Sequence, residues 1–113
     1  MLNTRRVVVT GIGGITAFGR DWQSIQTAFK AEKNAVKYMD WSGRFPELEA
    51  QLGAPIEGYS PPEHWTRKQL RSMGRVSHLC VDAAEQALTD AGLLGDERIT
   101  DGRMGVACGS SVG

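Results

Sequence analysis

The apolar residues near the start of the chain form a strand pattern. Three consecutive β-branched residues, Val7 to Val9, lie between Arg6 and Thr10, and Gly11 follows directly. This pattern is typical of a strand that is buried on both faces of a parallel sheet. We therefore expect a strand over residues 6–10, with helices above and below it.

The clearest periodicity in the second half of the chain is helical. Apolar residues recur at alternating three- and one-residue steps, at Val76, Leu79, Cys80, Ala83, Ala84, Ala87, Leu88 and Ala91. One unbroken stripe of this kind predicts an amphipathic helix whose apolar face is buried. Gly92 follows in the position of a left-handed cap. Because the stripe is built from small residues, a neighbour can approach it closely, and we expect Cys80 in the core.

Two shorter helices are predicted from their capping residues. Asp21 can cap a helix over about residues 22–31, whose apolar positions are Trp22, Ile25, Ala28 and Phe29. Thr66 and Gln69 have the spacing of a capping box, so a short helix should begin there. Residues 40–65 contain all four prolines of the chain, which excludes a long helix and allows one short strand at most.

Length and charge place the chain among ordinary soluble globular sequences. It has 113 residues, with 13 basic and 13 acidic side chains, so its zero net charge argues against a general nucleic-acid binder. No apolar run approaches the ~20 residues of a membrane span, and no signal peptide is recognisable, so we expect a cytoplasmic protein. Residues 104–113 read as an apolar strand entering a glycine and serine turn, so we expect a piece of a longer protein.

A glycine-rich segment, residues 11–16, follows the first predicted strand and precedes a helix. Together with a possible second strand over residues 35–39, this order is found in dinucleotide-binding folds. However, Thr16 stands at the third glycine position, and the helix begins near Asp21, so no helix N-terminus is available for a pyrophosphate. We favour a tight turn that lies beneath other backbone, and expect no cofactor.

Three further patterns lack the partners that catalysis needs. Ser111 stands in a G-x-S-x-G pattern typical of hydrolases, but both histidines, His64 and His78, precede it. Cys108 ends a predicted buried strand, and no basic residue lies close by in the sequence that would favour the reactive thiolate form. Two cysteines are too few for a disulfide framework, so we expect Cys80 and Cys108 as free thiols and predict no metal site.

Positive charges gather on the short helix that follows Thr66. Arg67, Lys68, Arg71 and Arg75 are one, three and four residues apart, and no acidic residue occurs over residues 65–81. Such a group is either a solvated basic face or a site for an anionic protein or phosphate partner. Because the chain as a whole carries no net charge, this local excess favours the partner site.

Four segments together resemble a known family. They are residues 5–13 (RRVVVTGIG), 67–73 (RKQLRSM), 90–93 (DAGL) and 105–110 (GVACGS). In this order and spacing they are similar to the N-terminal segment of the elongating β-ketoacyl-acyl-carrier-protein synthases. The resemblance implies an α/β fold, in which residues 1–113 form a single partial domain. This would be the N-terminal part of the first half of a thiolase-like, layered αβαβα fold, incomplete in this chain.

The resemblance also implies a reaction. The family catalyses a decarboxylative Claisen condensation of acyl and malonyl-carrier-protein thioesters, in fatty acid or aryl-polyene and polyketide-like biosynthesis. Its nucleophilic cysteine and two histidines lie in segments that residues 1–113 do not contain. We therefore expect no catalytic residue, metal or cofactor here, and neither Cys80 nor Cys108 inherits the role of the nucleophile.

Two functional elements of the family have matching positions in this chain. Arg67, Lys68 and Arg71 match the basic helix that docks acyl carrier protein, although Ser72 replaces a residue that is often basic. Val112 matches the aliphatic residue that gates the acyl pocket. The implied partners are acyl carrier protein, the remainder of the ketosynthase chain and a second subunit, in a homodimer or a heterodimer with a ketosynthase-like protein. No nucleic-acid or membrane partner is expected.

Two alternatives stay open. A non-catalytic ketosynthase-like chain-length factor would share this part of the fold and lack the nucleophile. A carrier-protein or anion-binding module with a basic helix is the second alternative. A cysteine in a T-A-C-type turn in the segment that follows would separate the ketosynthase from the chain-length factor.

Overall fold

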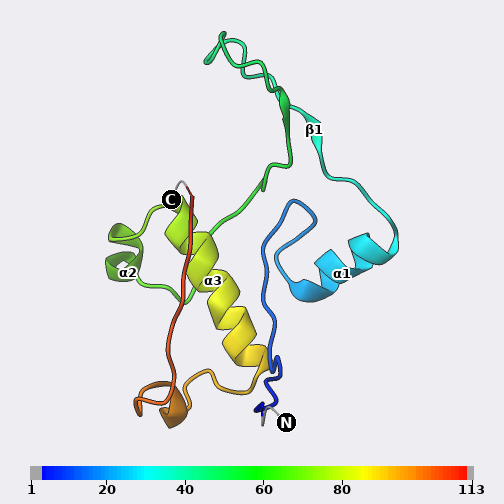
Figure 1. Ribbon diagram of the computed structural model, residues 1–113. Coiled ribbons are helices and arrows are strands. Elements are labelled where there is room, and N and C mark those ends of the chain that lie inside the picture. The colour runs from blue at the N-terminus through cyan, green and yellow to red at the C-terminus, as the bar shows by residue number, and fades with distance from the viewer. Residues whose placement is uncertain (1–3, 112–113) are drawn as a thin grey trace. The chain divides into compact units, whose positions relative to one another are not determined.

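The computed structural model describes residues 4–111, in which four helices and two short strands are joined by long loops (Figure 1). The elements in chain order are α1 (Trp22–Lys30), β1 (Lys37–Tyr38), β2 (Leu52–Gly53), α2 (Arg67–Arg71), α3 (Arg75–Asp90) and the 3-10 helix η1 (Glu97–Ile99). The chain divides into two compact units. The first consists of Met1–Gly14 with Pro61–Gly113, and the second of Ile15–Ser60.

In the second unit, α1 confirms the predicted capped helix and ends at Lys30, one residue earlier than expected. The Asp21 carboxylate accepts a hydrogen bond from the Ser24 backbone N–H at 2.8 Å, which lowers the pKa of Asp21. Ile25 and Ala28 are buried. Phe29 is 56% exposed, because no sheet covers that side of the helix among the described residues.

The strands of this unit are short. β1 pairs with β2 in antiparallel register, with Lys37 opposite Gly53 and Tyr38 opposite Leu52. One short strand within the proline-rich stretch therefore agrees with the sequence. This antiparallel register differs from the parallel pairing of strands in a dinucleotide-binding fold.

In the first unit, local capping determines where both helices begin or end. Thr66 caps α2 in a complete capping box, accepting from the Gln69 N–H at 3.3 Å while Gln69 Oε1 accepts from the Thr66 N–H at 2.8 Å. α3 extends over Arg75–Asp90, and Gly92 adopts φ +67°, the left-handed conformation that ends the helix. Both helix predictions are confirmed.

The predicted buried strands are not found in the described part of the chain. Over residues 6–10 no strand forms, and Val7, Val8 and Val9 are 93%, 73% and 80% exposed. Residues 104–108 likewise form no strand, and Val106 is 88% exposed. A strand inside a parallel sheet depends on neighbouring strands and covering helices, and residues 4–111 contain no such neighbours for these segments.

The buried side of α3 also differs from the prediction. Asp82, a polar residue, is 5% exposed, whereas Val76, Cys80 and Ala84 of the predicted apolar stripe are exposed. The expectation that Cys80 lies in the core is therefore wrong within this structure. Residues 104–111 run beside α3 (Figure 1) but leave these three residues exposed, so their burial would require other parts of a protein.

Candidate docking site

The candidate site is the basic surface of α2, defined by the side chains of Arg67, Lys68 and Arg71. All three residues are exposed, and α2 contains no acidic residue. None of the ion pairs among residues 4–111 involves these three side chains. Their charges are therefore available to a partner, which is the condition that docking requires.

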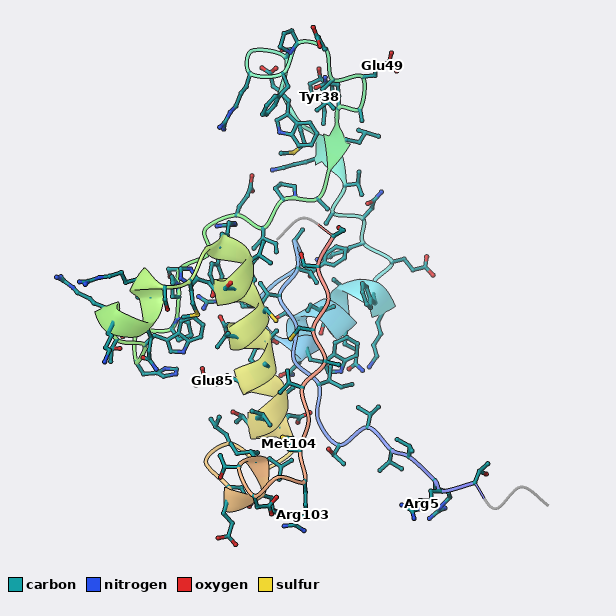
Figure 2. All side chains as sticks on the ribbon, turned by 60° about the vertical axis from the view of Figure 1, so that its left-hand side comes forward. Arg5, Tyr38, Glu49, Glu85, Arg103 and Met104 are labelled. Atoms are coloured by element: carbon teal, nitrogen blue, oxygen red, sulfur yellow. The ribbon has the colours of Figure 1, made fainter. Side chains whose placement is uncertain are left out.

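A cluster of three side chains holds the start of α2 against α3. Trp65 is buried, and its indole N–H donates to Glu85 Oε2 of α3 at 2.9 Å. The other carboxylate oxygen of Glu85 lies 2.5 Å from His64 Nε2. Glu85 points from α3 towards the side on which α2 lies (Figure 2). Because Trp65 directly precedes the capping residue Thr66, these bonds fix where the basic helix begins.

Two apolar hollows lie between α2 and α3, beside the basic surface. The smaller, about 260 Å³, is lined by Trp65, Gln69, Ser72, Met73 and Val81. The larger, about 360 Å³, shares three of these residues and is also lined by His64, by Ala84, Glu85 and Leu88 of α3, and by Leu94 beyond the end of that helix. Exposed cations beside an apolar hollow suit an acidic surface that carries a projecting apolar side chain.

A second feature of the same unit is the contact between the glycine-rich segment and α3. The Ile12 backbone N–H donates to Asp90 Oδ2 at 2.9 Å, and the Gly14 N–H donates to Gln86 Oε1 at 3.3 Å. Gln86 is oriented in turn by its amide, which donates to Asp82 Oδ1 at 3.0 Å. The amides of Ile12 and Gly14 are thus bonded to α3, and the segment lies close against the backbone of this helix, as expected. The predicted tight turn over residues 11–16 is not found there, because the turn follows at Thr16 and Gly19, whose backbones bond to each other.

The remaining candidates from the sequence do not join the basic surface. Cys80 and Cys108 are free thiols as expected, but both are exposed, so the prediction that Cys108 ends a buried strand is wrong for the described residues. Ser111 is exposed, and His78 is half-buried beside the Trp65 ring, with centroids 6.1 Å apart. Val112, the expected gate, lies outside the described residues.

Sequence reasoning found the basic surface but missed the cluster that positions it. Glu85 is 20 residues from Trp65, and nothing in the sequence around either residue indicates that their side chains form a hydrogen bond. Within residues 4–111, no group of three or more histidine, cysteine, aspartate and glutamate residues could hold a metal ion. Over the same residues, no helix has the length and apolar character needed to cross a membrane.

The chain matches the family model described as "Beta-ketoacyl synthase, N-terminal domain" over residues 4–113. It is 40% identical over 106 residues to nodulation protein E of Rhizobium leguminosarum bv. trifolii, covering 93% of this chain and 25% of that protein. It is 30% identical over 114 residues to 3-oxoacyl-[acyl-carrier-protein] synthase 2 of Synechocystis, covering 99% of this chain and 26% of that protein.

A solved structure agrees with these sequence matches. A β-ketoacyl synthase from Burkholderia phymatum superposes with a TM-score of 0.83 and 54% identity, over 96% of this chain and 26% of that chain. The chain therefore spans about a quarter of the length of the proteins it matches. The similarity confirms the expected fold class, an incomplete N-terminal part of a thiolase-like α/β fold. Since the family model matches nearly every residue, the chain belongs to the β-ketoacyl synthase family, within its N-terminal domain.

Proposed function

We propose that the protein containing this chain is a 3-oxoacyl-[acyl-carrier-protein] synthase, working in the cytoplasm, and that residues 1–113 form part of one domain of it. The observation that carries the proposal is the family match over residues 4–113, together with relatives that bear this enzyme's name. The proposed reaction moves an acyl group from a carrier thioester to an enzyme nucleophile. A malonyl thioester then loses carbon dioxide, and its carbanion attacks the acyl carbonyl, which forms the new carbon–carbon bond and releases the nucleophile.

The basic surface of α2 would contribute recognition to this reaction. Arg67, Lys68 and Arg71 are exposed and make no ion pair within residues 4–111, and they lie beside apolar hollows. An acidic helical surface of acyl carrier protein would bring carboxylates to the cations and an apolar side chain to a hollow. The structure thereby supports docking, and none of the described residues is proposed as the nucleophile.

Charge reversal in the full-length protein tests the docking. Changing Lys68→Glu and Arg71→Glu together should raise the apparent KM for acyl-carrier protein about tenfold, because each exposed pair contributes up to about 1 kcal/mol and reversal replaces attraction with repulsion. The salt dependence of that KM should also disappear. An acyl group on a small pantetheine thioester should react at the unchanged rate.

The matched control reverses two exposed lysines of the second unit, Lys30→Glu with Lys33→Glu. This pair carries the same change of charge and should leave the KM for acyl-carrier protein within about twofold. If the α2 variant lost activity equally with carrier-bound and pantetheine-bound substrates, Lys68 and Arg71 would be structural. If the unmodified protein failed to condense malonyl-carrier protein with any acyl group, it would not be a synthase, and the non-catalytic chain-length factor would be the better interpretation.

We also propose that Val112 gates the acyl pocket, on the family resemblance alone. Val112→Phe in the full-length protein should block long acyl groups and leave two-carbon primers and carrier docking intact, because the larger ring fills space that only long chains need. The measurement is the acylation rate as a function of chain length. A uniform loss at all chain lengths, or no loss at any, would show that Val112 does not line the pocket.

A further inference from the structure

The basic helix α2 is too short to fix its own orientation. It has five residues, and isolated helices of fewer than about 12 residues are marginal in water. Its C-terminal end is connected to α3 through residues 72–74, because α3 begins at Arg75. The direction in which the basic surface faces therefore depends on what binds the N-terminal end of α2.

Glu85 of α3 binds that end. One oxygen of its carboxylate accepts a hydrogen bond from the Trp65 indole N–H at 2.9 Å, and the other lies 2.5 Å from His64 Nε2. Glu85 is ten positions after Arg75, roughly 15 Å along the helix. Figure 2 shows Glu85 on the side of α3 where α2 lies. The short helix is thus joined to α3 at two separate points, by the chain at Arg75 and by Glu85.

The Trp65–Glu85 bond forms within one unit of the chain. Trp65 is 9% exposed, and the Glu85 side chain is 25% exposed. A hydrogen bond to a carboxylate is stronger than one between neutral groups, and partial burial strengthens it further. The N-terminal segment binds α3 in turn, through the Ile12 N–H and Asp90 Oδ2 at 2.9 Å. Glu85 therefore stands on a helix that is itself held in place.

We infer that Glu85 is a positioning residue for carrier recognition, which orients the basic surface of α2 through its bond to Trp65. The inference rests on the proposed docking of acyl carrier protein by α2. The Glu85 carboxylate would repel an acidic carrier, so its charge does not favour docking directly. Its contribution comes from keeping α2 in the orientation that the carrier binds.

Two substitutions at Glu85 in the full-length protein separate position from charge. Glu85→Gln keeps a side-chain oxygen that can accept from Trp65 and removes the charge, whereas Glu85→Ala removes both. The lost negative charge should affect both variants alike, and it should lower the KM for acyl-carrier protein or leave it unchanged. We expect the KM of Glu85→Ala to be about fivefold above that of Glu85→Gln. This ratio corresponds to α2 adopting the docking orientation about one-fifth of the time.

Trp65→Phe removes the other partner of the same bond and keeps an aromatic ring. It should raise the KM to a similar degree, and its combination with Glu85→Ala should add little, because both changes remove one interaction. Amide hydrogen exchange over residues 67–71 should be faster in Glu85→Ala and Trp65→Phe than in Glu85→Gln. The kcat with an acyl group on a small pantetheine thioester should be the same in all variants.

Glu63→Ala is the matched control. Glu63 is exposed and lies two residues before Trp65, so this variant removes the same charge near the basic surface and leaves the Trp65–Glu85 bond intact. Its KM for acyl-carrier protein should stay within about twofold of the unmodified protein or fall. Its amide exchange over residues 67–71 should not change.

Three results would overturn the inference. If Lys68→Glu with Arg71→Glu raised the KM while Glu85→Ala and Glu85→Gln had equal KM values, α2 would dock without being positioned by Glu85. If Glu85→Ala lowered kcat equally with carrier-bound and pantetheine-bound substrates, Glu85 would serve the fold in general. If the charge reversal left the KM unchanged, the docking on which the inference rests would itself be refuted.

Discussion

Gly11 and Gly13 allow the N-terminal segment to contact α3 at a distance that no side chain permits. A Cβ atom on Gly13 would clash with the carbonyl oxygen of Ala83, and one on Gly11 would clash with that of Ala87. Both obstacles are helix backbone, which cannot rotate away as a flexible side chain can. The spacing of these glycines thus serves close packing, and the hydrogen bonds to Gln86 and Asp90 depend on it.

Gly13→Ala should therefore destabilise the protein by about 2 kcal/mol, since the added methyl group overpacks a fixed backbone contact. The measurement is the free energy of unfolding from a denaturant titration of the full-length protein. Gly43→Ala is the control, because a Cβ there meets no atom within 4 Å in the described chain. Equal stability of the two variants would mean that the segment does not pack against α3 through Gly13.

At the level of elements, the sequence predicts what local interactions determine. Asp21, Thr66 and Gly92 each mark a helix end through a bond or conformation a few residues away, and all three helix predictions are confirmed. Strands over residues 6–10 and 104–108 depend on neighbours far along the chain, and the described residues do not supply them. The basic surface of α2 was predictable from charge spacing alone. The Trp65–Glu85 bond that positions it was not, because it joins separate elements.

The capping box is the local interaction with the clearest functional consequence. α2 has only five residues, so its end effects are large relative to its length. Thr66→Ala should cost about 1 kcal/mol of stability, because the Gln69 N–H loses its partner. It should also raise the KM for acyl-carrier protein without removing any charge. Urea unfolding and carrier kinetics measure the two effects.

Thr66→Ser is the control for this prediction, because serine keeps the hydroxyl group that caps the helix. Its unfolding free energy and KM should stay near those of the unmodified protein. If Thr66→Ala raised the KM while leaving stability unchanged, the hydroxyl itself would contact the carrier. If it changed neither quantity, the cap would not be needed to hold the basic surface in place.

For the whole molecule, the exposed apolar residues and the comparisons both indicate that further sequence is needed to bury these segments. Val7, Val8, Val9 and Val106 are each more than 70% exposed, in segments with the composition of buried strands. The chain spans about a quarter of the length of its relatives, so a full-length protein has ample further sequence to cover these segments. An α/β fold of stacked layers is thus consistent with residues 4–111, whose regular elements are helices and one small antiparallel strand pair.

Residues 1–113 produced alone should accordingly be poorly soluble and catalytically inactive. Unpaired apolar segments such as residues 7–9 offer backbone donors and acceptors to other chains, and this leads to aggregation at micromolar concentration. The measurement is sedimentation of the isolated chain, alongside turnover of malonyl-carrier protein.

Replacing Val7 and Val9 with Thr keeps the β-branched shape and adds a polar group, so it should increase the soluble fraction. Condensing activity in the isolated chain would contradict the assignment of catalysis to other segments, and full solubility as a monomer would show that the exposed valines are tolerated in water.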